Sequence, residues 1–239
     1  VCLLPKPDGD RRPILHFRSA FRLWSRCAQS TVKEWATHRA SDPCINNGAG
    51  RAPGDMVWRN LIRGDLKAQN GHQVVELLWD VSKAFERVQR HKLIDLAIDL
   101  GHPSNMLRLS LGSYAWPRRL MDGPLVSPPI TPNIGIGAGS SFATFELVAY
   151  VLADLRAIQT DHPYATLSLH VDDFTPQVEG LGDHGVIKNT LALAYDVIDR
   201  FEGKLGLPFD PQKCAAHKHL QNGSGDSSQQ ARAACRGTR

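Results

Sequence analysis

The sequence lacks the features that a membrane or secreted protein would need. Its five cysteines are scattered, odd in number and never paired as Cys-x-x-Cys, so neither a disulfide framework nor a zinc ribbon is indicated. No apolar run approaches the roughly 18 residues that span a bilayer, and the start of the chain has neither a basic stretch nor the apolar core of a signal peptide. We therefore expect an intracellular protein, nuclear or cytoplasmic, with no membrane partner.

A strong excess of one charge is also lacking. The formal net charge is +4, too small to indicate a partner. It is unevenly distributed, because residues 1–40 carry eight Lys and Arg against three acidic residues, a local net charge of +5. A basic end suits phosphate binding, and it is equally compatible with a solvated face. With 42% hydrophobic and 22% charged residues, the composition is that of a globular protein.

Helical periodicity identifies several amphipathic segments. From Phe17, apolar residues recur at helical spacing, and a basic row accompanies them at i, i+4 and i+8. The basic row is Arg18, Arg22 and Arg26. Further helices are expected over about ten residues from Met56, over 91–100, from a cap at Ser140 or Ser141, and over 186–201.

Apolar, β-rich runs predict the strands. One covers 73–81 and has Asp80 near its end; another covers 165–178 and turns tightly at Asp172-Asp173. A short strand is expected at 205–210. The remaining segments are expected to be loops at 41–55 and 122–139 and a disordered tail from 221 to 239.

The three aspartates are candidate metal ligands. Neighbouring side chains on a strand point to opposite faces, so Asp172 and Asp173 converge only if the backbone turns there. Carboxylates packed against apolar strands are costly unless a cation neutralises them, and Mg²⁺ prefers such oxygen ligands. Two ions about 4 Å apart would clamp the attacking and leaving oxygens of a displacement at phosphorus. The alternative is that Asp80 is a helix cap and Asp172-Asp173 an ordinary turn.

Five blocks of sequence, from residue 3 to about 218, resemble the reverse transcriptase domain of non-LTR retrotransposons and follow its order. They are Leu-Leu-Pro-Lys-Pro-Asp-Gly-Asp-Arg-Arg-Pro-Ile, Trp-Asp-Val-Ser-Lys-Ala-Phe-Glu-Arg-Val, Gly-Ile-Gly-Ala-Gly-Ser-Ser, Leu-His-Val-Asp-Asp-Phe and Leu-Gly-Leu-Pro-Phe-Asp-Pro-Gln-Lys-Cys. The second block, which is similar to the first palm motif, is the most specific match.

The resemblance implies an RNA-directed DNA polymerase that extends a DNA primer on an RNA template with deoxynucleoside triphosphates. It implies two Mg²⁺ ions, with Mn²⁺ as an alternative, held by Asp80, Asp172 and Asp173. Lys213 matches the lysine that approaches the leaving pyrophosphate and could donate a proton to it as general acid.

Further positions match residues that contact the nucleotide in that family. Lys6 and Arg12 flank a turn and match the two basic residues that contact the incoming triphosphate, Arg through a bidentate fork. Phe85 matches the aromatic residue that blocks a ribose 2′-hydroxyl. Gly139 lies in the turn that positions template and nucleotide, where glycine lets the backbone approach a base closely. The alternative for Lys6 and Arg12 is that they are exposed charges on a hairpin. For Phe85 it is a ring of the core, and for Lys213 a solvated lysine.

The fold that the resemblance implies is α+β, a polymerase palm in which helices back an antiparallel sheet, with partial fingers and no thumb. We expect a fingers-like part with the basic helix over 1–75, a palm over 76–220 and the tail over 221–239. Because the chain does not begin with Met, we expect it to be part of a longer reading frame.

Two positions depart from the family pattern. Ala138 stands where Gln is usual, which removes a template-positioning hydrogen bond, and His170 stands where Tyr or Phe is commoner. An RNA-dependent RNA polymerase shares the palm carboxylates, although Phe85 argues against it. A catalytically inactive retroelement remnant that only binds nucleic acid through its basic N-terminal face is the non-enzymatic alternative.

Overall fold

The computed structural model describes residues 1–6, 9–39, 44–45 and 53–219. The chain forms two compact units that are interleaved in sequence, Val1–Arg39 with Lys83–Val151 and Ala40–Ser82 with Leu152–Arg239. The expected division into a fingers-like part over 1–75 and a palm over 76–220 stays a prediction. In the described residues, no helix has the length and apolar character needed to cross a bilayer.

The first unit contains a small four-stranded sheet in the order β2-β1-β4-β5. Its strands are β1 (Cys2–Pro5), β2 (Arg11–Ile14), β4 (Met121–Asp122) and β5 (Leu125–Val126). The β1–β2 and β4–β5 pairs are antiparallel hairpins, and β4 runs parallel to β1. The helices of this unit are α1 (Ser19–Arg39), α3 (Ala84–Arg87), α4 (Arg90–Asp99), α5 (Ser104–Tyr114) and the first half of α6 (Ala143–Asp161).

Helices in this unit follow the sequence pattern more closely than strands do. The helix expected from Phe17 is confirmed and begins at Ser19, and the helix expected over 91–100 is α4. The long helix expected from a cap at Ser140 or Ser141 is α6, which begins at Ala143; the Ser140 hydroxyl accepts the N–H of Phe142, just before the helix, at 3.2 Å. The prediction that 122–139 is entirely loop is wrong, since Asp122 pairs with Leu125 around a glycine turn. Two-residue strands are too short to show a period.

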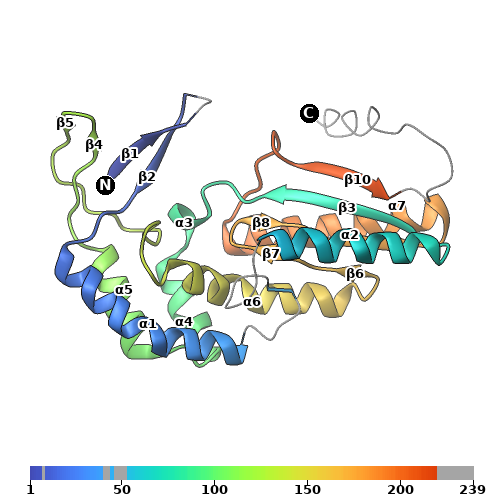
Figure 1. Cartoon of the computed structure of the whole chain (residues 1–239), viewed down its shortest axis with the longest axis horizontal. Helices are drawn as coiled ribbons and strands as arrows, with labels where there is room; N and C mark the ends of the chain where they lie inside the picture. Colours follow the sequence, from blue (N-terminus) through green and yellow to red (C-terminus); the bar gives the residue numbers. More distant parts are fainter. Residues whose placement is uncertain (7–8, 40–43, 46–52, 220–239) are drawn as a thin grey trace. The chain divides into compact units, whose positions relative to one another are not determined.

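The second unit is built on a six-stranded antiparallel sheet (Figure 1). The path is β6-β9-β3-β8-β7, and β10 pairs with β3. The strands are β3 (Gln73–Asp80), β6 (Ala165–Thr166), β7 (Leu169–His170), β8 (Asp173–Phe174), β9 (Gln177–Gly180) and β10 (Ala215–His219). Helices α2 (Pro53–Gln69) and α7 (Gly182–Ile198) pack on β3 and β9, and α7 continues as a π-helix over Asp199–Leu205. The strand β3 is therefore central to this unit.

Several predictions for the second unit need correction. The strand expected at 73–81 is confirmed as β3, whereas the helix expected over about ten residues from Met56 has 17 and begins at Pro53. The strand expected at 205–210 is wrong, because Gly206 has a φ of +72° and only Phe209 makes a β-bridge, to Val81. Strand β10 was not predicted. The proposed tail from 221 to 239 and most of the loop at 41–55 lie outside the described residues.

Candidate active site

An aromatic cluster in the second unit fixes the end of β3 against its neighbours. Trp79, Phe174, Phe201 and Phe209 lie in ring contact, with centroid distances from 4.9 Å (Trp79 to Phe209) to 6.5 Å (Phe174 to Phe209). Phe174 and Phe201 are fully buried. Rings of this size dominate the free energy of burial in a core, so they set the register of the strands that carry them.

This register places Asp80 directly opposite Asp173. The two residues are partners in the antiparallel β3–β8 ladder, one step beyond the Trp79–Phe174 pair. Directly opposite residues project from the same face of a sheet, with Cβ atoms roughly 5 Å apart. Asp80 is half-buried and Asp173 is exposed. Strand pairing alone therefore brings together two carboxylates that are far apart in the sequence.

Asp172 lies on the turn between β7 and β8. The sequence predicted a turn at Asp172-Asp173, and this is wrong by one residue: His170 pairs with Asp173, which leaves Val171 and Asp172 as the turn. Val171 has a φ of +59°, unusual for a β-branched residue. The carbonyl of Asp172 accepts the N–H of Val81 at 3.1 Å, which ties the turn to the end of β3.

The carboxyl group of Asp172 is electrostatically coupled to the other two. Its pKa is raised above the usual value, first by burial and then by the negative charges of Asp173 and Asp80, while Lys213 lowers it. Like charges held close together disfavour ionisation of one another. A cation at this position would relieve that repulsion.

Lys213 reaches the same place from the segment that precedes β10. Two backbone hydrogen bonds dock this segment on the end of β3, from Asp210 N–H to the Asp80 carbonyl at 2.9 Å and from Ser82 N–H to the Pro208 carbonyl at 2.8 Å. The Nζ of Lys213 then lies 2.8 Å from Oδ2 of Asp80 and 3.7 Å from Oδ2 of Asp210. The hydrogen bond to Asp80 is the main cause of a raised pKa of Lys213. All four predicted catalytic residues thus lie in one unit and converge.

A cleft of about 480 Å³ lies beside these residues, between α2 and the strand ends. Asp80, Asp173 and Lys213 line it together with apolar residues of α2 such as Met56 and Leu61. Three further polar residues, which were not predicted from the sequence, also line the cleft. They are Asn60, Glu76 and Thr175. None lies in a recognised block, so only the tertiary structure could identify them.

Among these polar residues, Asn60 is held by the protein itself. It is buried, its Oδ1 accepts the Ser168 hydroxyl at 3.1 Å, and its carbonyl accepts Nε2 of Gln177 at 2.6 Å. These bonds fix α2 against the sheet. Asn60 therefore shapes the wall of the cleft.

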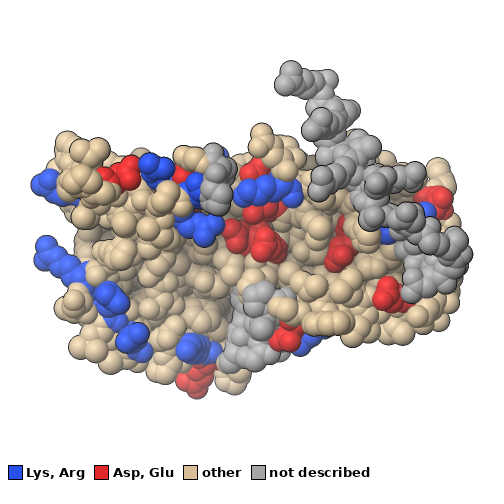
Figure 2. Space-filling view, turned by 45° about the horizontal axis from the view of Figure 1, so that its top comes forward, with Lys and Arg blue, Asp and Glu red and all other residues tan. Residues whose placement is uncertain are grey.

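The donor set suits a hard divalent cation, since every ligand is a carboxylate oxygen. Within the described residues, no three His, Cys, Asp or Glu side chains are close enough together to hold a metal ion as they stand. The ammonium of Lys213 instead supplies the positive charge at Asp80. Figure 2 shows exposed acidic side chains grouped on the face in view, with basic side chains next to them. A metal ion at Asp80 would compete with Lys213 for one of its oxygens.

The other predicted site residues belong to the first unit. Lys6 and Arg12 lie on the β1–β2 hairpin, where Arg12 is paired with Leu4 and is exposed. Lys6 forms an ion pair with Asp10 at 3.4 Å. The pKa of Asp10 is lowered, first by the backbone N–H of Arg11 and then by Lys6. Contact of this hairpin with a triphosphate stays a prediction.

Gly137 and Gly139, in the turn before α6, lie against the chain at Leu15. Gly139 has a φ of +103°, and a Cβ there would lie 2.8 Å from the carbonyl oxygen of Leu15. A Cβ at Gly137 would clash with Leu15 Cδ2. The N–H of Leu15 also donates to the carbonyl of Ala138 at 2.8 Å. The glycines thus let this turn pack on the protein's own backbone, and contact between Gly139 and a nucleotide stays a prediction.

Phe85 lies in α3, where its backbone carbonyl accepts the N–H of Ile136 at 2.7 Å. Its side chain is half-buried. The backbone of α3 therefore holds the start of the glycine turn within the first unit. A role of the Phe85 ring against a sugar stays a prediction.

Comparison with known proteins identifies the fold. No protein family profile and no curated protein matches the sequence. Among solved structures, the chain is similar to the telomerase of Candida tropicalis in complex with the TWJ fragment of telomeric RNA, with a TM-score of 0.65 and 13% identity over 93% of this chain and 41% of that chain. The corresponding complex of Candida albicans gives 0.63 and 11% over 92% and 43%.

The apo telomerase of Candida tropicalis truncated from its C-terminal domain is also similar, with a TM-score of 0.58 and 12% identity over 90% of this chain and 49% of that chain. The chain spans less than half the length of these telomerase chains. At this identity the likeness shows the fold alone. The chain shares the fold of part of these telomerase chains, a mixed arrangement of helices and antiparallel sheet.

Proposed function

We propose that this chain is the catalytic core of an RNA-directed DNA polymerase of the non-LTR retrotransposon type. One observation carries the proposal: on a polymerase-like fold, Asp80 lies opposite Asp173 in a strand pair, and Asp172 sits on the adjoining turn. Polar side chains that converge at strand ends, one of them with a raised pKa, mark a functional site. The order of the sequence blocks supports the retrotransposon type.

In this proposal Asp80, Asp172 and Asp173 hold two Mg²⁺ ions, or Mn²⁺ in their place. When bound, the ions would neutralise charge on the attacking and leaving oxygens at phosphorus. The protein's own contribution is to hold Asp80 at the end of β3 beside Asp172 and Asp173 of the β7–β8 hairpin before substrate arrives. Lys213, whose pKa is raised, keeps its proton at neutral pH and can pass it from Nζ to a leaving pyrophosphate.

The substrates in the proposal are an RNA template, a DNA primer and deoxynucleoside triphosphates. Two of the Candida telomerase structures are complexes with a TWJ fragment of telomeric RNA, which supports a nucleic-acid partner for this chain. Exposed Arg12 and half-buried Lys6, which also pairs with Asp10, would bind the triphosphate from one hairpin. Phe85 would exclude a ribose 2′-hydroxyl by steric contact.

Primer extension on an RNA template tests the proposal. We expect Mg²⁺-dependent incorporation that falls at least about 100-fold in Asp172→Asn, since a missing ligand removes transition-state stabilisation. Asp99→Asn is the matched control, because Asp99 is exposed on α4 and outside the cleft. Incorporation that Asp172→Asn leaves unchanged would contradict the assignment.

The choice of sugar separates the proposal from an RNA-dependent RNA polymerase. The wild-type chain should prefer deoxynucleotides, and Phe85→Ala should admit ribonucleotides. A preference for ribonucleotides in the wild type would favour the RNA polymerase. Salt-sensitive nucleic-acid binding without any extension would favour an inactive remnant.

A further inference from the structure

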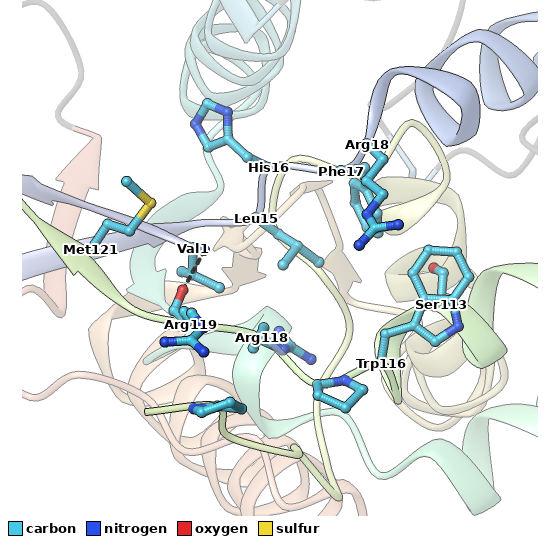
Figure 3. A pocket seen from close by; sticks show the side chains of 12 residues that line it. Val1, Leu15, His16, Phe17, Arg18, Ser113, Trp116, Arg118, Arg119 and Met121 are labelled. Atoms are coloured by element: carbon cyan, nitrogen blue, oxygen red, sulfur yellow. Dashed lines mark hydrogen bonds between the residues drawn. The ribbon is translucent and has the colours of Figure 1, made fainter. Parts of the chain in front are cut away.

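The first unit contains a basic cavity that the proposed catalytic role does not use. Its volume is about 420 Å³, within the range of about 300–1,000 Å³ for ligand sites. Three arginines and no acidic residue line it: Arg18, Arg118 and Arg119. In Figure 3 the guanidinium groups of Arg18 and Arg118 point toward the open space beside Trp116. The cavity is therefore suited to an anion.

Two of the three arginines of this cavity are held by hydrogen bonds that do not neutralise them. Arg118 Nη2 donates to the carbonyl of Tyr114 at 2.6 Å, and Arg119 Nη1 donates to the carbonyl of Ser127 at 3.4 Å. Neither acceptor carries a formal charge. In the described part of the chain, no carboxylate forms an ion pair with the three arginines. Uncompensated positive charge in a concave site attracts anions more strongly than the same charge on a flat surface.

The cavity also presents an aromatic ring that is fixed on one side and exposed on the other. Trp116 contacts Phe21 edge to face, with ring centroids 5.7 Å apart at 75°. Phe21 in turn stacks on Phe17 at 4.4 Å and lies 5.2 Å from Trp24. Even so, Trp116 is 51% exposed. A positioned ring with a free surface is a stacking platform for a nucleobase.

The positive charge continues along α1 away from the cavity. Arg18, Arg22 and Arg26 are exposed at four-residue intervals, a rise of about 6 Å for each step along the helix. Figure 2 shows Lys and Arg side chains in a row over α1. Successive phosphates of an extended single strand can follow such a row. A duplex fits less well, because its stacked bases cannot reach the ring of Trp116.

We propose that the cavity and the exposed face of α1 form a binding track for single-stranded nucleic acid. One base stacks on Trp116, and its phosphate lies between Arg18 and Arg118. The following phosphates contact Arg22 and Arg26. These contacts use base faces and phosphates, so RNA and DNA strands both bind. The track does not depend on polymerase activity.

Fluorescence anisotropy of the full chain with labelled single strands of about 12 nucleotides, oligo(U) or oligo(dT), tests the track. The buffer contains EDTA, so that metal-dependent chemistry does not contribute. We expect Trp116→Ala to raise Kd by about 10-fold or more and Trp116→Phe to restore most of the affinity. Trp58→Ala is the matched control, since Trp58 is 67% exposed and lies in the other unit.

The arginines are tested through the salt dependence of binding. The double variant Arg22→Gln, Arg26→Gln should lower the slope of log K against log salt by about 0.7 for each lost phosphate contact. Arg108→Gln, which removes an exposed arginine of α5 outside the cavity, should leave the slope unchanged. Binding is measured in EDTA and needs no primer extension, so failure of the polymerase proposal leaves this test intact.

Three results would overturn the track. The first is a Kd that Trp116→Ala leaves unchanged or that Trp58→Ala raises equally. The second is equal affinity for a duplex of the same length. The third is competition by millimolar inorganic phosphate that abolishes binding of the strand, which would reduce the cavity to an ion site.

Discussion

The ammonium group of Lys213 lies 2.8 Å from a carboxylate oxygen of Asp80, although 133 residues separate them in the sequence. Asp80 ends the central strand β3, and Lys213 follows a turn that docks on the end of that strand. The ion pair joins the second and the last of the five sequence blocks. It also makes Lys213 a competitor for any cation that Asp80 would bind.

Removing the ammonium should therefore strengthen cation binding while weakening catalysis. In Lys213→Gln we expect tighter Mg²⁺ binding by calorimetry, because Asp80 loses its partner and the repulsion that Asp80 and Asp173 exert on Asp172 is no longer offset by the ammonium. Primer extension should fall by about 10²–10⁴-fold, the usual contribution of a general acid. Lys213→Arg keeps the charge and should leave Mg²⁺ affinity near the wild-type value. Equal Mg²⁺ affinity in all three proteins would contradict the competition.

The buried Glu146 should make stability depend on pH. Burial raises its pKa to about 7, and its Oε2 accepts the Tyr114 hydroxyl at 2.7 Å. Because the pKa is higher in the folded state, the proton stabilises the fold below about pH 4.5. This stabilisation is lost as pH rises to about 7, on the order of 3 kcal/mol.

Urea unfolding across that pH range measures the effect of Glu146. The variant Glu146→Gln, which cannot ionise, should show a flatter dependence of unfolding free energy on pH between about 4.5 and 7. Asp99→Asn is an exposed control that should keep the wild-type curve. If the curve of Glu146→Gln runs parallel to that of the wild type, the folded protein does not bind a proton at Glu146 in this pH range.

The left-handed conformation of Val171 predicts that glycine is better at this position. A β-branched residue at a φ of +59° is strained by about 1–2 kcal/mol. Val171→Gly should therefore raise the unfolding free energy by up to about 1 kcal/mol, after the entropy cost of glycine. Val75→Gly, in the extended strand β3, should lower it. Thermal unfolding of both variants makes the comparison.

Opposite effects are expected from alanine at two glycines of the first unit. Gly139→Ala should destabilise by about 1–3 kcal/mol, because its φ is +103° and the new Cβ would lie 2.8 Å from the Leu15 carbonyl oxygen. Gly112→Ala, in helix α5 with no atom within 4 Å of the new Cβ, should stabilise by about 0.5–1 kcal/mol. Similar unfolding midpoints for the two variants would count against the packing described here.

Local patterns predicted the long elements and misplaced the short ones. The strand at 73–81 and the helix from Phe17 could be predicted because the hydrophobic pattern of each repeats several times. The turn at Asp172 was off by one residue, because an unfavourable φ at Val171 is tolerated only when ladder hydrogen bonds on both sides impose it. The expected strand at 205–210 failed since Gly206 and Pro208 favour a bend over an extended ladder.

The sequence by itself determined which residues carry the candidate chemistry: Asp80 at the end of an apolar run, the Asp172-Asp173 pair and Lys213 in the last block. These depend on residue type and block order, which are local. Only the tertiary structure decided that Asp80 faces Asp173, that Lys213 bonds to Asp80, and that Trp116 stands exposed beside Arg18 and Arg118. Register and docking depend on the packing of rings such as Phe174 and Phe209, and distant segments come together only when that core forms.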